Sequence, residues 1–319
     1  MKKDALPLVS VPVVTYNSSA TIIETLDSIY NQTYPNLELI ISDDCSKDDT
    51  VKKCSAWIDA HKDRFVHTEL ITVPENTGVS ANLNRAEKAC KGEWIKGIAG
   101  DDVMLPDCIS DNVQFIQENP QAMYVFSRIV PFGNNKPIVD SYMNNDIFDY
   151  TIFDKSTEDQ LNAFVLEDKH IPAPSVFYNK PYSEKLAIRL DERLPLIDDE
   201  PRWINVLKTG THLYFFDKVT VKYRVGDADA LSSPIHVLSP KQFESMCRFY
   251  FYYKFPTRYQ RDPEQAIEQM IGLISYNYRI AYEFKKEKNA VTRKLYDLYA
   301  NTWFFKEKIR RYLQLKAKQ

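Results

Sequence analysis

Short apolar runs alternate with segments of helical periodicity from residue 8 to about residue 127 of the chain. Apolar runs of strand length occupy residues 8–14, 37–41, 69–73 and 94–99, and helical spacing recurs over 22–29, 47–60 and 79–90. Continuous apolar strands that alternate with helices are typical of a parallel sheet covered on both faces. The pattern therefore predicts an α/β fold, in which ligands bind at the carboxyl ends of the strands.

The remainder of the chain follows two other patterns. Residues 104–235 are less regular and contain loop-like stretches, whereas the chain from residue 240 onward is mostly helical in its periodicity. We therefore expect three parts, which span residues 1–103, 104–235 and 236–319.

Composition narrows the class of protein. The 319 residues are 44% hydrophobic and 27% charged, as is usual for a folded globular chain, and a net charge of −3 gives no reason to expect a nucleic-acid partner. The five cysteines are an odd number without metal-ligand spacing, which favours a reducing, cytoplasmic setting. No apolar stretch approaches the roughly 18 residues of a membrane span, and the first residues have no signal-peptide core.

Polar residues interrupt the pattern directly after each predicted strand. They are residues 15–17, 43–44, 76–78 and 101–102. Four polar strand ends on one edge of a parallel sheet form a site by geometry alone. Carboxylates at such a place suit a hard divalent cation, which takes oxygen ligands and often bridges phosphates.

Each acid pair also has a purely structural interpretation. Asp43 and Asp44 precede a predicted helix and could cap it, and Asp101 with Asp102 could form a turn and a helix start before Pro106. The joint placement of the pairs favours a binding site over these separate roles.

Several motifs, taken in order and spacing, resemble family 2 glycosyltransferases of the GT-A fold. They are residues 9–17, Asn31–Pro35, Ser42–Thr50, Asn76–Ala81 and Lys91–Asp102, followed by Pro106. The resemblance is specific over about residues 7–120 and looser to about 235. It implies a Rossmann-like, mostly parallel sheet with helices on both faces, plus a C-terminal helical region. It further implies that residues 1–103 bind the nucleotide-sugar, that residues 104–235 bind the acceptor and carry the catalytic base, and that residues 236–319 form a helical extension.

The same resemblance implies a nucleotide-sugar donor, commonly a UDP-sugar, and a Mg²⁺ or Mn²⁺ ion. Tyr16 matches the residue that stacks on the uracil, Asp44 the residue that bonds the uracil imide N–H, and Asp101 the metal ligand, with Asp102 beside it. The residues expected to bind the donor are Thr15, Tyr16, Asn17, Asp43, Asp44, Asn76, Gly78, Asn84 and Asp102.

The chain departs from the family pattern at three places. The first acid of the family's Asp-X-Asp motif falls here on Ala99 or Gly100, so the metal would rest on Asp101 and the donor diphosphate. Pro12 stands in mid-strand, where it cannot donate to the ladder. Leu83 replaces an arginine that many relatives carry.

Inverting sugar transfer needs a base that takes the proton of the attacking hydroxyl. The segment 196–203 resembles the family's Glu-Asp segment, in which the second acid, here Asp199, is the base. An acidic helix start that complements the helix dipole is the alternative, and both can hold together. Residues 171–175 resemble the family's acceptor-side loop. Gly226 stands where many relatives have a histidine, with His212 and His236 as candidate substitutes.

The aromatic and basic C-terminal helices have two interpretations. They could pack as a helical cap, or residues 300–313 could contact the inner membrane beside a lipid-linked acceptor. The overall expectation is a cytoplasmic hexosyl- or N-acetylhexosaminyltransferase, peripheral at the cytoplasmic membrane face in the second case, that acts on a glycan or lipid-linked acceptor for a bacterial surface polysaccharide. The alternatives are a non-catalytic sugar-nucleotide-binding scaffold subunit and a nucleotidyltransferase.

Overall fold

The structure is a computed structural model that describes residues 6–144, 148–194, 196–225 and 240–273. The chain divides into two compact units, Met1–Ser233 and Pro234–Gln319. The further division of the first unit at residue 103 stays a prediction.

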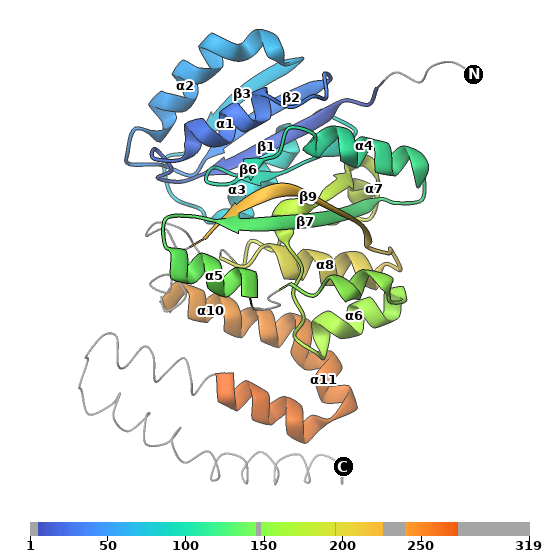
Figure 1. Cartoon of the computed structure of the whole chain (residues 1–319). Helices are drawn as coiled ribbons and strands as arrows, with labels where there is room; N and C mark the ends of the chain where they lie inside the picture. The colour runs from blue at the N-terminus through green and yellow to red at the C-terminus, as the bar shows by residue number, and fades with distance from the viewer. Residues whose placement is uncertain (1–5, 145–147, 195, 226–239, 274–319) are drawn as a thin grey trace, which may run out of the picture. The chain divides into compact units, whose positions relative to one another are not determined.

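The described strands of the first unit form one mixed sheet (Figure 1). They are β1 (Val9–Thr15), β2 (Leu37–Asp43), β3 (His67–Thr72), β4 (Trp94–Ile95), β5 (Ile98–Ala99), β6 (Val103–Met104), β7 (Tyr124–Phe132), β8 (Phe177–Asn179) and β9 (Tyr214–Arg224). The order is β3-β2-β1-β4-β8-β7-β9-β6, and β5 pairs with β1. The parallel pairs are β1–β2, β1–β4, β1–β5, β2–β3 and β7–β9. The antiparallel pairs are β4–β8, β7–β8 and β6–β9.

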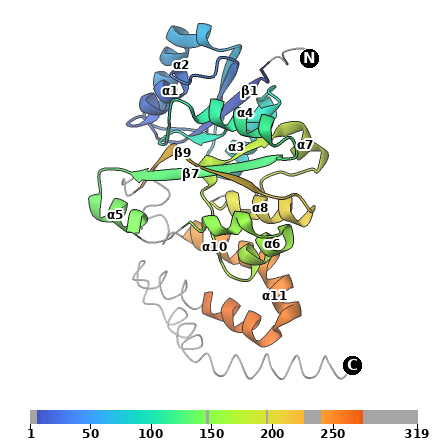
Figure 2. The same cartoon turned by 45° about the vertical axis from the view of Figure 1, so that its right-hand side comes forward.

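The helices of the first unit follow the strands in the alternation that the sequence predicts. They are α1 (Ile22–Tyr30), α2 (Thr50–His61), α3 (Val79–Ala89), α4 (Cys108–Glu118), α5 (Lys136–Asn144), α6 (Thr157–Val165), α7 (Lys180–Lys185) and α8 (Asp199–Lys208). α1 and α2 pack together beside β1–β3 (Figure 2). The strand order reverses after β3, so right-handed crossovers place α3 on the other face. The predicted α/β fold with helices on both faces is confirmed.

β1 and β2 are the buried centre of the N-terminal half. All seven residues of β2 and six of the seven of β1 are buried. Strands buried on both faces read as continuous apolar runs, which is why the sequence identifies them. Their apolar side chains pack with Ile22, Leu26 and Ile29 of α1 in the main hydrophobic core.

The predicted strand at 94–99 is broken into β4 and β5 opposite Pro12. Ser10 O accepts from Lys96 N at 3.0 Å and Val14 O from Gly100 N at 2.9 Å, so this edge of β1 faces the broken strand. Pro12 lies between them on the same edge and has no N–H to donate, which interrupts the ladder. The Lys96 side chain at the break is fully buried and donates to the carbonyls of Pro174 and Val176, next to the predicted acceptor-side loop.

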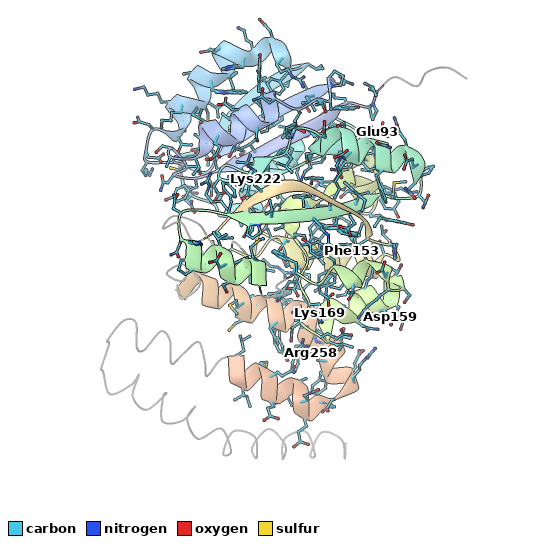
Figure 3. The ribbon with its side chains drawn as sticks, in the orientation of Figure 1. Glu93, Phe153, Asp159, Lys169, Lys222 and Arg258 are labelled. Carbon is cyan, nitrogen blue, oxygen red and sulfur yellow. The ribbon has the colours of Figure 1, made fainter. Side chains whose placement is uncertain are left out.

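Aromatic side chains fill the space between the second half of the sheet and its helices. Phe153 stacks on Phe215 of β9 with ring centroids 5.0 Å apart, and it is labelled in Figure 3. Trp203 of α8 meets Phe126 of β7 edge-on at 4.9 Å. α8 is therefore anchored to the sheet by a buried indole.

The second unit is helical where it is described, as the sequence predicts. α10 (Pro240–Phe249), a π-helical turn (Tyr250–Lys254), α11 (Phe255–Arg261) and a helix over 263–273 follow one another. Tyr250 donates to Ala266 O at 3.0 Å and closes the unit on itself. In the described residues no helix has the length and apolarity needed to cross a membrane. The proposed membrane contact at 300–313 lies outside the described residues.

Candidate active site

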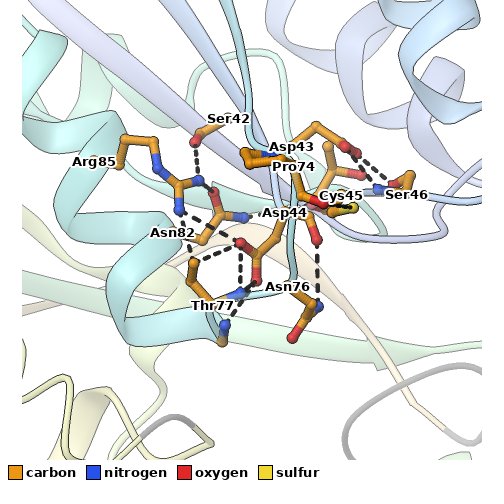
Figure 4. Close-up of polar contacts among 12 residues, drawn as sticks. Ser42, Asp43, Asp44, Cys45, Ser46, Pro74, Asn76, Thr77, Asn82 and Arg85 are labelled. Carbon is orange, nitrogen blue, oxygen red and sulfur yellow. Dashed lines mark hydrogen bonds and ion pairs between the residues drawn. The ribbon is translucent and has the colours of Figure 1, made fainter.

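Asp44, the acid expected to bond the uracil, is buried in a hydrogen-bond network at the carboxyl end of β2 (Figure 4). Its carboxylate accepts from Thr77 N at 3.0 Å, Thr77 Oγ1 at 2.6 Å and Gly78 N at 2.7 Å. The Arg85 guanidinium lies 3.4 Å away and also donates to Ser42 Oγ. These donors occupy most of the acceptor positions of a carboxylate. Asp44 thus holds the loop before α3 against the end of β2.

Gly78 closes this loop in a conformation that glycine adopts at low cost. Its φ is +92°, and it is the residue that precedes α3. Asn76 donates from Nδ2 to Asp44 O at 3.3 Å, so the loop is bonded to both the backbone and the side chain of Asp44. Asn76 and Gly78 therefore lie where the sequence places them, at the edge of the sheet beside Asp44.

The loop after β1 brings the next predicted residues to the same edge. Asn17 has a φ of +52° and is bonded to the loop after β2, because its N–H donates to Ser46 Oγ at 2.8 Å and its Oδ1 accepts from Lys47 N at 2.8 Å. Asp43 is fully buried and accepts from Ser46 N and Ser46 Oγ. Asp43 therefore closes a turn and does not cap α2, which begins at Thr50.

Thr15, the last residue of β1, and Tyr16, which follows it, differ in exposure. Tyr16 is 47% exposed and presents its ring at the edge of the sheet. The hydroxyl oxygen of Thr15 is buried and has no hydrogen-bond partner among the residues that the structure describes. The exposed Tyr16 ring suits the flat base of a nucleoside, whereas the Thr15 hydroxyl lies inside the protein next to Gly100.

Three hydroxyls on one face of α1 and at its start hold the loop that carries Asp101 and Asp102. Thr21 donates to Gly100 O and Thr25 to Asp102 O, both at 2.8 Å, and Ser28 Oγ accepts from Met104 N at 3.1 Å. Their spacing of four and three residues places them in one row along the helix. The backbone of the acid loop is therefore fixed at three successive points.

Arg224 holds the same loop from the end of β9. Its backbone N–H donates to Asp102 Oδ1 at 2.8 Å, and its Nε donates to Asp101 O at 2.7 Å. Its guanidinium lies over the Phe132 ring at 4.3 Å and forms an ion pair with Glu24 of α1. The acid loop is thus clamped between α1 and β9.

The two acids of the loop differ in environment. Burial and the neighbouring Asp101 carboxylate raise the pKa of Asp102 well above its usual range. Asp102 is 1% exposed and binds the β9 backbone, whereas Asp101 is partly exposed. Asp101 is therefore the better placed of the two to ligate a cation from solvent.

A divalent cation at this site would depend on few protein ligands. Among the described residues, no group of three His, Cys, Asp or Glu side chains could hold a metal ion. A Cβ at Gly100 would lie 3.0 Å from Thr15 Oγ1 and 3.2 Å from Ile22 Cδ1, so an acid cannot replace this glycine without a shift of its neighbours. One carboxylate still fits Mg²⁺, which proteins often bind through one or two carboxylates together with substrate phosphates.

Asp199 is the first residue of α8 and the second candidate centre of the site. Its burial, together with the charges of Asp198 and Glu200, raises its pKa to about 7. Its Oδ1 accepts from Glu200 N at 2.7 Å. A carboxyl group with this pKa changes between proton acceptor and donor near neutral pH, as a general base requires.

Tyr223 of β9 is a partly buried residue that the charges of both centres influence. Burial, followed by the nearby charges of Asp102, Asp101 and Asp199, raises its pKa above the usual range. The charges of the acid loop and of Asp199 therefore both act on this hydroxyl.

Two further expectations concern residues away from this edge. The Asn84 amide, expected at the donor, bonds instead to Leu190 in both directions, at 3.0 and 3.1 Å, and to Glu192 at 2.9 Å.

His212 lies before the start of the 11-residue strand β9, whereas the acid loop is bonded to the other end of β9. A strand of this length spans roughly 35 Å, so the suggestion that His212 replaces a histidine at the active site is wrong. His236 lies outside the described residues.

The fold matches those of solved glycosyltransferases. The structure of S. aureus TarS 1-349 in complex with UDP-GlcNAc matches with a TM-score of 0.58 at 17% identity, over 86% of this chain and 81% of that one. The mannosyltransferase PcManGT of Pyrobaculum calidifontis, in complex with GDP-Man and Mn²⁺, matches with a TM-score of 0.56 at 18% identity, over 93% of this chain and 85% of that one. The GT-A fold is thereby confirmed.

Sequence comparison points to the same family. The Escherichia coli protein WfaP, a UDP-Glc:α-D-GlcNAc-diphosphoundecaprenol β-1,3-glucosyltransferase, is 27% identical over 224 residues, 69% of this chain and 78% of WfaP. Another curated relative, 31% identical over 126 residues, is covered over only 44% of its length. The model of the family described as "Glycosyl transferase family 2" matches residues 10–177, just over half of the chain. The chain belongs to glycosyl transferase family 2.

Proposed function

We propose that the chain is an inverting, metal-dependent glycosyltransferase that transfers a sugar from a UDP-sugar to a hydroxyl of a glycan or lipid-linked acceptor. The observation that carries the proposal is a pair of acids: Asp101, partly exposed on a loop that Arg224 clamps, and Asp199 at the start of α8, whose pKa is about 7. One acid suits the diphosphate end of the donor and the other the attacking hydroxyl.

The donor would lie along the edge formed by the loops after β1, β2 and β5. Tyr16, with its exposed ring, would stack on the base. Asp44 stabilises the conformation of this edge, because its carboxylate bonds Thr77 and Gly78 to the end of β2. Its own bond to a uracil N–H would require one of its present donors to move.

Asp101 would hold the cation together with the diphosphate. A bound Mg²⁺ or Mn²⁺ supplies Lewis-acid charge that stabilises the departing nucleoside diphosphate. Arg224 and the α1 hydroxyls fix the backbone of the Asp101 loop, so the carboxylate is held in place before the donor arrives.

Asp199 would take the proton of the acceptor hydroxyl while its oxygen attacks the anomeric carbon. The bond from that carbon to the diphosphate breaks at the same time, and attack from the opposite side inverts the configuration. A base with a pKa of about 7 is unprotonated in a sizeable fraction of molecules at neutral pH.

The names of the relatives support the choice of substrates. WfaP is named as a UDP-Glc-dependent enzyme with a diphosphoundecaprenol-linked acceptor, and the TarS structure contains UDP-GlcNAc. We infer a UDP-hexose or UDP-N-acetylhexosamine as donor and a role in the assembly of a bacterial surface polysaccharide.

A panel of UDP-Glc, UDP-GlcNAc and GDP-mannose, incubated with and without Mn²⁺, tests the proposal without knowledge of the acceptor. We expect Mn²⁺-dependent release of UDP from one UDP-sugar by hydrolysis, and loss of most of that release in Asp101→Asn. If the protein binds UDP with Mn²⁺ but consumes no donor, a non-catalytic binding subunit is the better account. Formation of UTP from a UDP-sugar and pyrophosphate would instead identify a nucleotidyltransferase.

A further inference from the structure

Helix α3 carries polar residues on two faces, and each face is bonded to a different half of the proposed site. Asn82 and Arg85, together with Gly78 that precedes the helix, form one row, the donor face, and Ser80, Asn84 and Glu87 form another, the base face. Within each row the spacing is four and then three residues, which aligns side chains along a helix. The rows are offset by two residues, or about 200° around the helix axis, so they point in nearly opposite directions.

The donor face contacts the ends of β1 and β2. Gly78 N donates to Asp44 Oδ2 at 2.7 Å, and Arg85 contacts both Asp44 and Ser42. Asn82 is 3% exposed and donates to Thr15 O at 3.4 Å. These contacts attach α3 to the residues proposed to surround the nucleotide.

The first contacts of the base face are with residues 190–194, which precede α8. Ser80 Oγ donates to Leu194 O at 2.8 Å. Asn84 pairs with Leu190 as a second backbone strand would, because its Nδ2 donates to Leu190 O and its Oδ1 accepts from Leu190 N. Side-chain amides that bond to a backbone in both directions fix its position and its direction.

The last contact of the base face is a buried ion pair with α8 itself. Arg202 Nη2 lies 2.8 and 2.7 Å from the two carboxylate oxygens of Glu87, and the two side chains are 5% and 15% exposed. Arg202 follows Asp199 by three residues, so the two side chains lie near one another at the first turn of the helix. The guanidinium also lies over the Tyr178 ring at 5.3 Å. α8 is therefore fixed to α3 at the turn that carries Asp199.

We propose that α3 is a rigid spacer that sets the position of Asp199 relative to the bound donor, with Asn84 and Glu87 as positioning residues. The inference rests on the proposed role of Asp199 as the base. It also assigns Asn84 to the base side of the reaction, whereas the sequence suggested the donor side. A displacement of a catalytic group by about 1 Å can lower the rate by about 100-fold, so a spacer of this kind acts on turnover.

Two asparagines of α3 provide a matched pair of variants. Asn84→Ala removes the base-face contact with Leu190, and Asn82→Ala removes the donor-face contact with Thr15. We expect Asn84→Ala to lower kcat for UDP-sugar turnover by about tenfold or more, with a Kd for UDP and Mn²⁺ within about twofold of the wild-type value. Asn82→Ala should instead weaken UDP binding. Isothermal titration calorimetry and donor turnover give the two readouts.

Asn84→Asp provides a second variant in case the alanine variant folds poorly. It keeps the side-chain shape and the acceptor for Leu190 N, but it loses the donor and places a carboxylate beside Glu192. We expect the same division between kcat and UDP affinity in this variant. Thermal melting of both variants identifies the one that is folded at the assay temperature.

The decisive comparison uses the Asp199→Asn background. If Asn84 acts through Asp199, Asn84→Ala lowers turnover in the wild type but causes no further loss in Asp199→Asn. Equal losses in both backgrounds, or a loss of UDP affinity that matches Asn82→Ala, would overturn the spacer role. Undiminished turnover in Asp199→Asn alone would instead refute the proposed base, and absence of UDP binding in the wild type would refute the proposed donor.

Discussion

At the scale of single residues, the acids at the edge of the sheet differ in what surrounds them. Asp44 and Asp102 are buried and accept from backbone N–H groups, and the half-buried Asp199 accepts from Glu200 N. Asp101 is partly exposed. The sequence motif places all four acids, but it does not show which carboxylates are already occupied by the protein. Occupancy depends on Thr77, Gly78 and Arg224, and Arg224 is more than 100 residues away from Asp102 in the sequence.

Asp44→Ala should destabilise the fold as well as weaken donor binding. Without the carboxylate, Thr77 N and Gly78 N lose a buried acceptor, which costs about 3 kcal/mol of unfolding free energy in total. Urea unfolding measures the change. The control is Asp49→Ala, an exposed residue that forms no side-chain cap on α2 and should shift stability by less than about 0.5 kcal/mol. Equal stability of the two variants would show that the Asp44 network is not structural.

Tyr16→Ala should act on the nucleotide alone. The side chain is 47% exposed, so its removal leaves stability nearly unchanged. Loss of base stacking should weaken UDP binding by about 1–3 kcal/mol, while Tyr16→Phe should bind like the wild type because it keeps the ring. Calorimetry with UDP and Mn²⁺ gives both affinities. A Tyr16→Ala protein with wild-type affinity would remove Tyr16 from the donor site.

At the scale of elements, the buried parallel half of the sheet could be predicted and the second half could not. β1 and β2 are continuous apolar runs because helices cover both faces, and a local pattern is enough to identify them. β7 and β9 pair in parallel although about 80 residues separate them, with a register shift near Arg128. Nothing in a local window of sequence specifies that pairing. The pattern of residues 94–99 alone does not predict the break between β4 and β5, because the cause of the break, Pro12, lies on the neighbouring strand.

Residues of the site come from elements that are far apart in the sequence, so their contacts could not be predicted from the sequence alone. Tyr223 and Arg224 reach the acid loop only because β9 lies beside β6 and β7. Asn84 and Arg85 are neighbours in the sequence but face different halves of the site. Helical spacing could have separated the two faces of α3, but their partners become known only from the fold.

The row of hydroxyls on α1 leads to a prediction for that element. Thr25→Val keeps the side-chain volume and removes the hydrogen bond to Asp102 O, which should cost about 1–2 kcal/mol of stability. The acid loop should loosen, so a higher Mn²⁺ concentration should be needed for half-maximal turnover. Thr68→Val on the edge strand β3 is the matched control and should leave the Mn²⁺ requirement unchanged. An unchanged requirement in Thr25→Val would contradict a positioning role for α1.

At the scale of the whole molecule, the family match and the proposed chemistry cover different lengths of chain. The match ends at residue 177, whereas Asp199, Tyr223 and Arg224 follow it. The family match and the fold therefore both support the proposed donor site. The proposal that Asp199 is the base is supported by the environment of Asp199 at the start of α8 and by the contacts between α8 and α3.

The membrane interpretation of residues 300–313 makes a prediction for the full chain. If these residues contact lipid, the protein should float with vesicles that contain anionic lipid, because aromatic and basic side chains there would bind the interface. Substitution of Trp303, Phe304 and Phe305 by serine should lower the floated fraction severalfold. Equal flotation of the two proteins would favour the interpretation as a helical cap.

The pH dependence of UDP-sugar turnover tests whether Asp199 is the catalytic base. Protonated Asp199 cannot accept a proton, so kcat/KM should fall about tenfold per pH unit below pH 7 and reach a plateau above it. Asp199→Asn should lower kcat by about 10² to 10⁴-fold and abolish this midpoint, with UDP affinity retained. An Asp199→Asn protein that turns over its donor at the wild-type rate, with the same midpoint, would contradict the account.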